Sequence, residues 1–284
     1  MSAEASAVLS ESEYDNFCEF FYRKTGIRFS NQKRYFVDKR IADRITESGR
    51  GNFGIWFRSL RLDNDPEELQ HLVDALTVNE TYFYRETEQL DLLLGKILPE
   101  VLNVPGHPDE VRIWSMPCSS GEEPYSIALR LLEDWEDVDR YDISIFGTDI
   151  DSKMIQRARA GLYSERSVQK LGRSLRSRYF QQEKQGWRIV EELRSSIDFR
   201  RVNALDRTAM RRFQDIDVIF CRNMLIYFDD LSRRKCVDAL YDALRPGGYL
   251  FMGMSESLGR VPTHFDVERH RGSIVYRKPM KGGR

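Results

Sequence analysis

The stretch from Val111 to Leu132 constrains the fold more than any other, and it begins V-R-I-W-S-M-P-C-S-S-G-E-E-P-Y-S-I-A-L. An apolar run ends near Trp114, small residues follow, and apolar residues then recur at the spacing of one helical face. This pattern predicts a strand, a tight loop and a helix. In an open α/β sheet, the loop after an early strand lies at the edge where nucleotide ligands bind.

The composition of this loop narrows the choice of ligand. It carries no lysine and lacks G-x-G-x-x-G, and Glu122 and Glu123 stand at the helix start, where they would repel a pyrophosphate. Gly121 would let a ligand approach the backbone closely. We therefore expect a cationic or hydroxyl-rich ligand, and S-adenosylmethionine fits. The alternative is that Ser119 with Glu122, and Ser120 with Glu123, form ordinary capping boxes.

From Val111 onward, strand-like and helix-like patterns alternate, which predicts a mostly parallel sheet with helices on both faces. Within residues 162–200 two β-like runs, the second at 197–202, predict a small antiparallel excursion. The last two runs, 265–270 and 273–277, are too close for a helical crossover and must pair antiparallel. An antiparallel final hairpin on a parallel sheet is the arrangement of class I methyltransferases.

Two polar residues follow later strands. Asp149 ends the run 141–150, where an acid would bind a ribose diol, although Asp149 or Asp151 would equally serve as a helix cap. Asn203 follows the run 197–202, where its amide would suit an adenine edge, but asparagine is also a common turn residue.

Residues before the sheet are expected to be helical. Their patterns predict a helical domain over 1–100, a linker over 101–110 and an α/β domain over 111–284. In a helix expected over 30–48, Lys33, Arg40 and Arg44 share one face beside an apolar stripe. This basic face is either solvated surface or a docking strip for an acidic helical partner.

The stretch 76–86, L-T-V-N-E-T-Y-F-Y-R-E, sets Asn79, Thr81 and Arg85 among aromatic residues. Buried polar groups need partners, so these side chains either cap their own backbone or face a polar ligand.

Composition excludes several classes of protein. With a net charge of −1, the protein as a whole does not attract a nucleic acid electrostatically. No apolar run reaches the length of a membrane span. The four cysteines are scattered without metal-ligand spacing, so no metal site is expected. We expect a cytoplasmic protein that does not insert into membranes.

Six ordered stretches over residues 12–279 resemble the CheR-type chemotaxis-receptor glutamate methyltransferases: the 76–86 stretch, S-S-G-E-E-P-Y-S, G-T-D-I-D, V-N-A-L, I-F-C-R-N-M-L-I-Y-F and M-S-E-S-L. The resemblance implies a class I S-adenosylmethionine methyltransferase domain with a small β-subdomain at 162–200, preceded by an all-helical domain. It implies that nine positions contact S-adenosylmethionine or its product S-adenosylhomocysteine: Asn79, Thr81, Arg85, Glu123, Asp149, Asn203, Ala204, Arg222 and Asn223. One departure is Met254, where many relatives have histidine.

The resemblance also implies a function and a partner. Arg85 and Tyr227 would place the glutamate carboxylate of a chemoreceptor, and the basic helix with Lys33, Arg40 and Arg44 would dock on the receptor's cytoplasmic helices. The short connection 181–186 contrasts with the longer, glycine-richer one of relatives that bind a receptor tail, so we expect that no tail peptide is needed. We also expect a monomer. The competing functions are another S-adenosylmethionine-dependent methyltransferase and a non-catalytic signalling adaptor.

Overall fold

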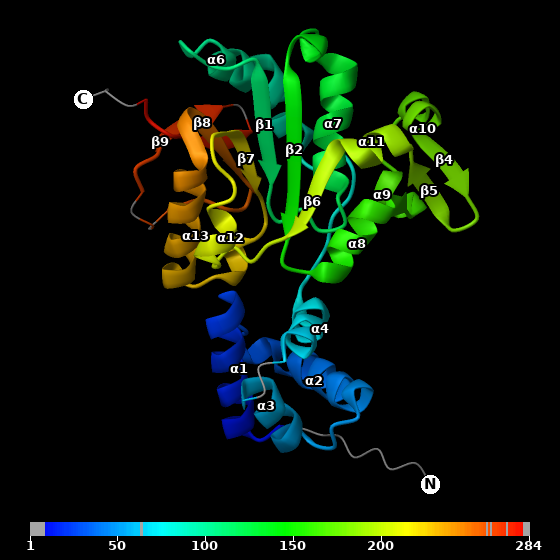
Figure 1. The fold of residues 1–284 in the computed structure, drawn as a ribbon, viewed down its shortest axis with the longest axis vertical. Coiled ribbons are helices and arrows are strands. Elements are labelled where there is room, and N and C mark those ends of the chain that lie inside the picture. The colour runs from blue at the N-terminus through cyan, green and yellow to red at the C-terminus, as the bar shows by residue number, and fades with distance from the viewer. Residues whose placement is uncertain (1–8, 63–64, 260, 262, 271, 281–284) are drawn as a thin grey trace. The chain divides into compact units, whose positions relative to one another are not determined.

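The computed structural model describes residues 9–62, 65–259, 261, 263–270 and 272–280. The chain divides into two compact units (Figure 1). We call Met1–Val78 with Tyr227–Asp229 the helical unit, and Asn79–Ile226 with Asp230–Arg284 the α/β unit.

The helical unit follows its local sequence signals. Ser10 and Glu13 form a capping box at its first helix, which Gly26 ends in the left-handed conformation. Asp65 caps the last helix ahead of Pro66. The elements are α1 (Glu11–Thr25), the 3-10 turn η1 (Asn31–Lys33), α2 (Arg34–Ser48), α3 (Phe53–Leu62) and α4 (Pro66–Leu76). Buried aromatic side chains of α1 and α3, such as Phe17 and Trp56, form the core.

The α/β unit is built on a seven-stranded sheet in the order β6-β2-β1-β7-β8-β10-β9. Strands from β6 to β8 run parallel, whereas β10 pairs antiparallel with both β8 and β9. This confirms the predicted class I methyltransferase arrangement with its antiparallel final hairpin. The strands are β1 (Glu110–Ser115), β2 (Asp142–Asp149), β6 (Ile197–Arg201), β7 (Ile216–Cys221), β8 (Leu244–Met252), β9 (Asp266–His270) and β10 (Ser273–Arg277).

Helices cover both faces of this sheet. Since alternate residues of a strand point to opposite faces, neighbouring residues of β1 pack against different helices. Ile113 of β1 packs into one core cluster with Ile127 of α7 and Ile155 of α8, whereas the neighbouring Trp114 stacks on Phe213, which follows α12. Figure 1 shows α12 and α13 side by side. The helices are α5 (Thr87–Leu92), the π-helical η2 (Leu93–Ile97), α6 (Leu98–Leu102), α7 (Glu122–Asp134), η3 (Val138–Arg140), α8 (Ser152–Ala160), α11 (Glu191–Ser196), α12 (Arg207–Met210), η4 (Leu225–Tyr227) and α13 (Asp230–Ala243).

A small antiparallel sheet in the order β3-β5-β4 confirms the predicted excursion. It consists of β3 (Leu162–Tyr163), β4 (Phe180–Glu183) and β5 (Gly186–Ile189), with α9 (Glu165–Val168) and α10 (Arg173–Tyr179) between β3 and β4. Residues 197–202 do not belong to it, contrary to expectation. Instead β6 pairs in parallel with β2 at one edge of the main sheet, because Phe199 packs against Tyr125 of α7 in the main core.

The division between the units falls after Val78 rather than near residue 100. The helix over 87–102 is amphipathic, and its side chains Leu90, Leu93 and Ile97 are buried in the core cluster of the α/β unit. The expected linker over 101–110 is also packed there, since His107 contacts the buried Asp217 of β7 at 2.8 Å.

Within the described residues, no helix is both long and apolar enough to cross a membrane.

Candidate functional site

The glutamates of the loop after β1 do not form the capping boxes that were the alternative interpretation. Gly121 (φ +94) is the N-cap of α7, and no side chain caps this helix, so neither predicted capping box forms. Glu122 accepts instead from the hydroxyls of Ser120 (2.7 Å) and Ser167 (2.8 Å), and Glu123 accepts from Ser115 (2.7 Å). The loop therefore directs one buried carboxylate toward α9 and the other toward the end of β1.

On the side where a Cβ atom would stand, Gly121 is packed against protein. A Cβ atom at this position would lie 2.9 Å from Cβ of Ala158 and 3.1 Å from both the Phe199 ring and the Tyr163 hydroxyl. Glycine is required here because α7 begins in a left-handed conformation directly against α8 and β6.

Asp149 lies at the carboxyl end of β2 and is buried. Its two carboxylate oxygens accept from the backbone N–H groups of Ser119 (2.8 Å) and Asp151 (2.9 Å), so it joins the loops after β1 and β2. Burial raises the pKa of Asp149 to about 6, although the backbone donors act against this rise. It is Asp151, not Asp149, that caps α8 through the backbone N–H groups of Lys153 and Met154.

Asn79 reaches the same edge of the sheet. Its side-chain amide donates to Asp151 (2.7 Å), and its carbonyl accepts from the Ser119 hydroxyl (3.3 Å). Asn79 therefore links the segment before α5 to the loops after β1 and β2 rather than capping a helix, which was its alternative role. Thr81 lies two residues further along and is partly buried.

Arg222, directly after β7, connects three segments of the site. Its guanidinium donates to Glu123 (2.8 Å) and to the carbonyl of Arg85 (2.8 Å), and it pairs with Glu86 at 3.0 Å. The side chain of Arg222 is only 4% exposed, so these protein groups take the place of water around its guanidinium. Burial raises the pKa of Glu123, and Arg222 opposes that rise.

The side chain of Arg85 is less constrained than that of Arg222. It donates to the Glu80 carbonyl (2.9 Å) and lies 5.8 Å from the ring centroid of Tyr82. This leaves a partly exposed guanidinium beside the carboxylate network.

Asn223 adopts a left-handed backbone conformation (φ 59) that few residues other than glycine tolerate. The carboxylate of Glu256 holds this turn, accepting from the backbone N–H groups of Asn223, of Gly253 (3.2 Å) and of Ile226 (3.2 Å). The pKa of Glu256 is raised because the carboxyl group is buried, and these backbone donors oppose that rise.

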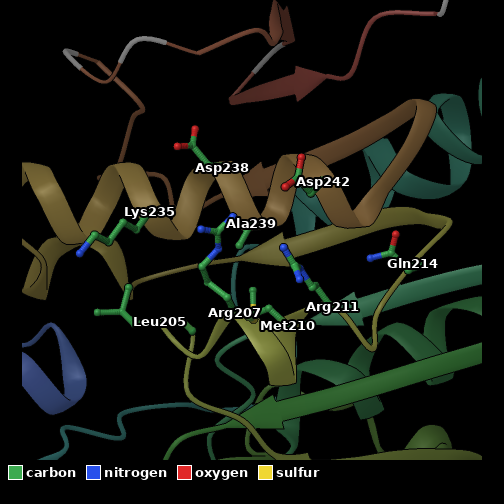
Figure 2. A pocket seen from close by; sticks show the side chains of 10 residues that line it. Leu205, Arg207, Met210, Arg211, Gln214, Lys235, Asp238, Ala239 and Asp242 are labelled. Atoms are coloured by element: carbon green, nitrogen blue, oxygen red, sulfur yellow. The ribbon is translucent and has the colours of Figure 1, made fainter.

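Asn203 and Ala204 follow β6. The Asn203 side chain accepts from the backbone N–H of Leu205 (2.9 Å), so its alternative role as a turn residue is realised. Buried Ala204 lines a groove of about 440 Å³ between α12 and α13 (Figure 2). The other residues that line this groove are Leu205, Arg207, Met210, Arg211, Gln214, Lys235, Asp238, Ala239 and Asp242. The groove contains none of the other expected cofactor positions, and its walls carry both signs of charge.

The remaining expected residues belong to the helical unit. Tyr227 accepts through its carbonyl from the backbone of Arg28 (3.1 Å). Lys33 and Arg40 are exposed. Arg44 is not part of an exposed basic face, contrary to expectation. It is buried against α4, where its guanidinium contacts Glu68 at 2.6 Å and 3.3 Å.

The side chains at the carboxyl ends of β1, β2 and β7 suit S-adenosylmethionine. Asp149 is a buried acid whose bonds to backbone N–H groups leave acceptor capacity for ribose hydroxyls, and Glu123 offers negative charge for an amino group. Among the described residues, Nε of Arg222 is buried without a hydrogen-bond partner. The fold and this donor set define a class I S-adenosylmethionine-dependent methyltransferase.

Comparison with known proteins defines the family. The family model described as "CheR methyltransferase, SAM binding domain" matches residues 79–273, and the one described as "CheR methyltransferase, all-alpha domain" matches residues 12–77. The chain therefore belongs to the CheR methyltransferase family.

Curated relatives cover nearly the whole chain. The chain is 47% identical to chemotaxis protein methyltransferase 2 of Vibrio cholerae, over 97% of this chain and 96% of that protein. It is 33% identical to the chemotaxis protein methyltransferase of Vibrio parahaemolyticus (95% and 98%) and 31% identical to chemotaxis protein methyltransferase 1 of Pseudomonas aeruginosa (94% and 98%).

Sequence reasoning assigned no role to Glu86 or Glu256, and it considered Glu122 only for its charge and for capping at the start of the helix. Glu256 lies in the quoted M-S-E-S-L stretch, so its position was visible but its function was not. Besides the nearby Gly253, its partners are backbone N–H groups 30 and 33 residues away. Every residue except proline carries such a donor, so the sequence does not show which one a carboxylate will meet.

Proposed function

We propose that this methyltransferase transfers the methyl group of S-adenosylmethionine to glutamate side chains in the cytoplasmic helical domain of chemoreceptors. The products would be glutamate methyl esters and S-adenosylhomocysteine. The proposal is supported by the family to which the chain belongs and by relatives named as chemotaxis methyltransferases.

The observation that carries the choice of acceptor is that all four histidines of the chain contact residues outside the proposed site. His71 lies beside Glu68, His107 beside Asp217 and His270 beside Glu268, and the ring of His264 packs on Tyr241. A glutamate acceptor needs no base, because its carboxyl group has a pKa near ~4.3 and is already an anionic nucleophile at neutral pH. An amine acceptor would first have to lose a proton.

The chain's own groups would bind and orient the reactants. Asn79, Thr81, Glu123, Asp149, Asn203, Ala204, Arg222 and Asn223 would hold S-adenosylmethionine, whose sulfonium makes methyl transfer favourable. Arg85 would orient the acceptor carboxylate through its partly exposed guanidinium, and Tyr227 would assist in its placement. Alignment rather than proton transfer would account for catalysis.

The test is transfer of a labelled methyl group from S-adenosylmethionine to purified chemoreceptor. We expect labelled receptor whose label is released as methanol by mild base, as for a methyl ester. Base-stable label would indicate a different acceptor, and cofactor binding without any transfer would indicate an adaptor.

We also propose that Lys33 and Arg40 dock on acidic receptor helices. Both are exposed cations, and exposed charge pairs are individually weak and screened by salt. The double variant Lys33→Ser/Arg40→Ser should raise the KM for receptor at low salt, with little effect at high salt. The matched control is Arg58→Ser/Arg61→Ser, which removes two exposed cations from α3. An equal effect of the control would argue against a specific docking face.

Finally, we propose that the enzyme acts as a monomer and needs no receptor tail peptide. The short connection 181–186 belongs mostly to the β4–β5 hairpin itself. It is tight at Gly186, where a Cβ atom would lie 2.1 Å from the Tyr163 carbonyl. Equal methylation of full-length and tail-deleted receptor is expected. Micromolar binding of a tail peptide, with a large loss of rate on tail deletion, would refute this part.

A further inference from the structure

Two large apolar side chains are exposed on the loops that follow β7 and β8. Ile226 is 51% exposed and Met254 is 61% exposed. We call these two residues the apolar lip. In the sequence, Ile226 lies three residues after Asn223, which is proposed to bind cofactor, and directly before Tyr227, which is proposed to place the acceptor.

The two loops are held together by one buried carboxylate. Glu256, from the Met254 loop, accepts from the backbone N–H groups of Asn223 and Ile226 in the other loop and from Gly253 in its own. Gly253 also packs against Asn223, since a Cβ atom there would lie 2.9 Å from the Asn223 side-chain nitrogen. The backbone of the lip is therefore fixed before any partner binds.

The position of the lip restricts what can cover it. A helix is about 10–12 Å wide with its side chains, which is more than the reach of one glutamate side chain. A helix that presents a glutamate to this site must therefore lie across the loops that border the site. An amphipathic helix carries apolar side chains three or four residues from the glutamate, on the same face.

We propose that Ile226 and Met254 form a contact surface for apolar residues one turn away from the acceptor glutamate on the receptor helix. This inference rests on the proposed function and names a further determinant of its substrate specificity. The lip would select glutamates that have an apolar neighbour at helical spacing.

The test compares the double variant Ile226→Gln/Met254→Gln with the matched control Leu132→Gln/Val267→Gln. The control side chains are 46% and 54% exposed, on α7 and β9. Loss of two apolar contacts should raise the KM for receptor about tenfold or more, with kcat and S-adenosylhomocysteine affinity within about twofold of wild type. Because the contact is apolar, the defect should persist at high salt, unlike that of Lys33→Ser/Arg40→Ser.

Circular dichroism establishes that each variant is folded, calorimetry measures its affinity for S-adenosylhomocysteine, and Met254→Leu should retain the wild-type KM. A KM for the double variant within about twofold of wild type would overturn the proposal, as would an equal rise in the control. Loss of S-adenosylhomocysteine binding in the double variant would also overturn it, because the lip would then belong to the cofactor site. Failure of the wild-type protein to methylate receptor would instead refute the proposed function.

Discussion

Substitution of Arg44 by methionine tests whether this residue stabilises the helical unit or docks a partner. The Arg44 and Glu68 side chains are 10% and 6% exposed, and their closest atoms are 2.6 Å apart. Glu68 also accepts from the indole N–H of Trp56 (2.8 Å). Arg44→Met would leave the buried Glu68 carboxylate with that hydrogen-bond donor and with His71 at 3.9 Å. Removing one partner of a buried pair costs about 3–5 kcal/mol.

A second substitution should recover most of this loss. In Arg44→Met/Glu68→Gln the amide oxygen can still accept from Trp56, but no buried charge remains. Since replacing both members of a buried pair is often nearly neutral, we expect the double variant to lie within about 2 kcal/mol of wild type. Lys33→Ser/Arg40→Ser removes exposed charges only and should change stability by less than about 0.5 kcal/mol.

The assay is amide hydrogen exchange of α2 and α4 in the full chain, because it measures the stability of the helical unit separately from that of the α/β unit. A loss of 3–5 kcal/mol corresponds to exchange that is faster by about two to four orders of magnitude. Unchanged exchange in Arg44→Met, combined with a raised KM for receptor, would refute the structural role and restore the docking hypothesis.

Three further predictions concern the α/β unit and the reaction. Because the pKa of Asp149 rises from 3.8 to about 6 on folding, the folded state binds more protons between these values, and stability should fall as pH rises through them. Asp149→Asn should therefore flatten the pH dependence of unfolding between about pH 4 and 6, yet weaken S-adenosylhomocysteine binding by about 1–3 kcal/mol in calorimetry. Arg222→Met leaves Glu123 and Glu86 without their cation and should lower unfolding stability by about 3–5 kcal/mol, with partial recovery in Arg222→Met/Glu123→Gln. Tyr227→Phe and Arg85→Ala should lower kcat more than they raise the KM for receptor, and wild-type turnover in both variants would exclude their proposed roles.

Local sequence patterns were sufficient to predict most elements of the fold. The strand, loop and helix of β1 and α7 follow from a change of apolar period within about twenty residues. The final hairpin follows from a connection too short for any crossover, and β9 and β10 do pair antiparallel. Such predictions succeed because periodicity, capping and connection length act between residues that are close in the chain.

Assignments that depend on distant partners could not be made in this way. The spacing of Arg44 predicted the helix face it occupies, but only the packing of α4 shows that its side chain is buried against Glu68. The patterns over 1–100 predicted helices, but not that the apolar side chains of residues 87–102 join the α/β core. Likewise the β-like run at 197–202 did not reveal that β6 would pair with β2.

The sequence alone thus determined the class of fold, its cofactor and the stretches that carry the site, because these follow from local patterns and from resemblance along the chain. Only the tertiary structure showed that Arg222 joins Glu123 and Glu86, that Glu256 holds the turn at Asn223, and that Gly121 serves packing. The physical reason is that the type of a charged or polar side chain limits the partners it can bind, whereas burial and the approach of distant segments decide which of these partners it contacts.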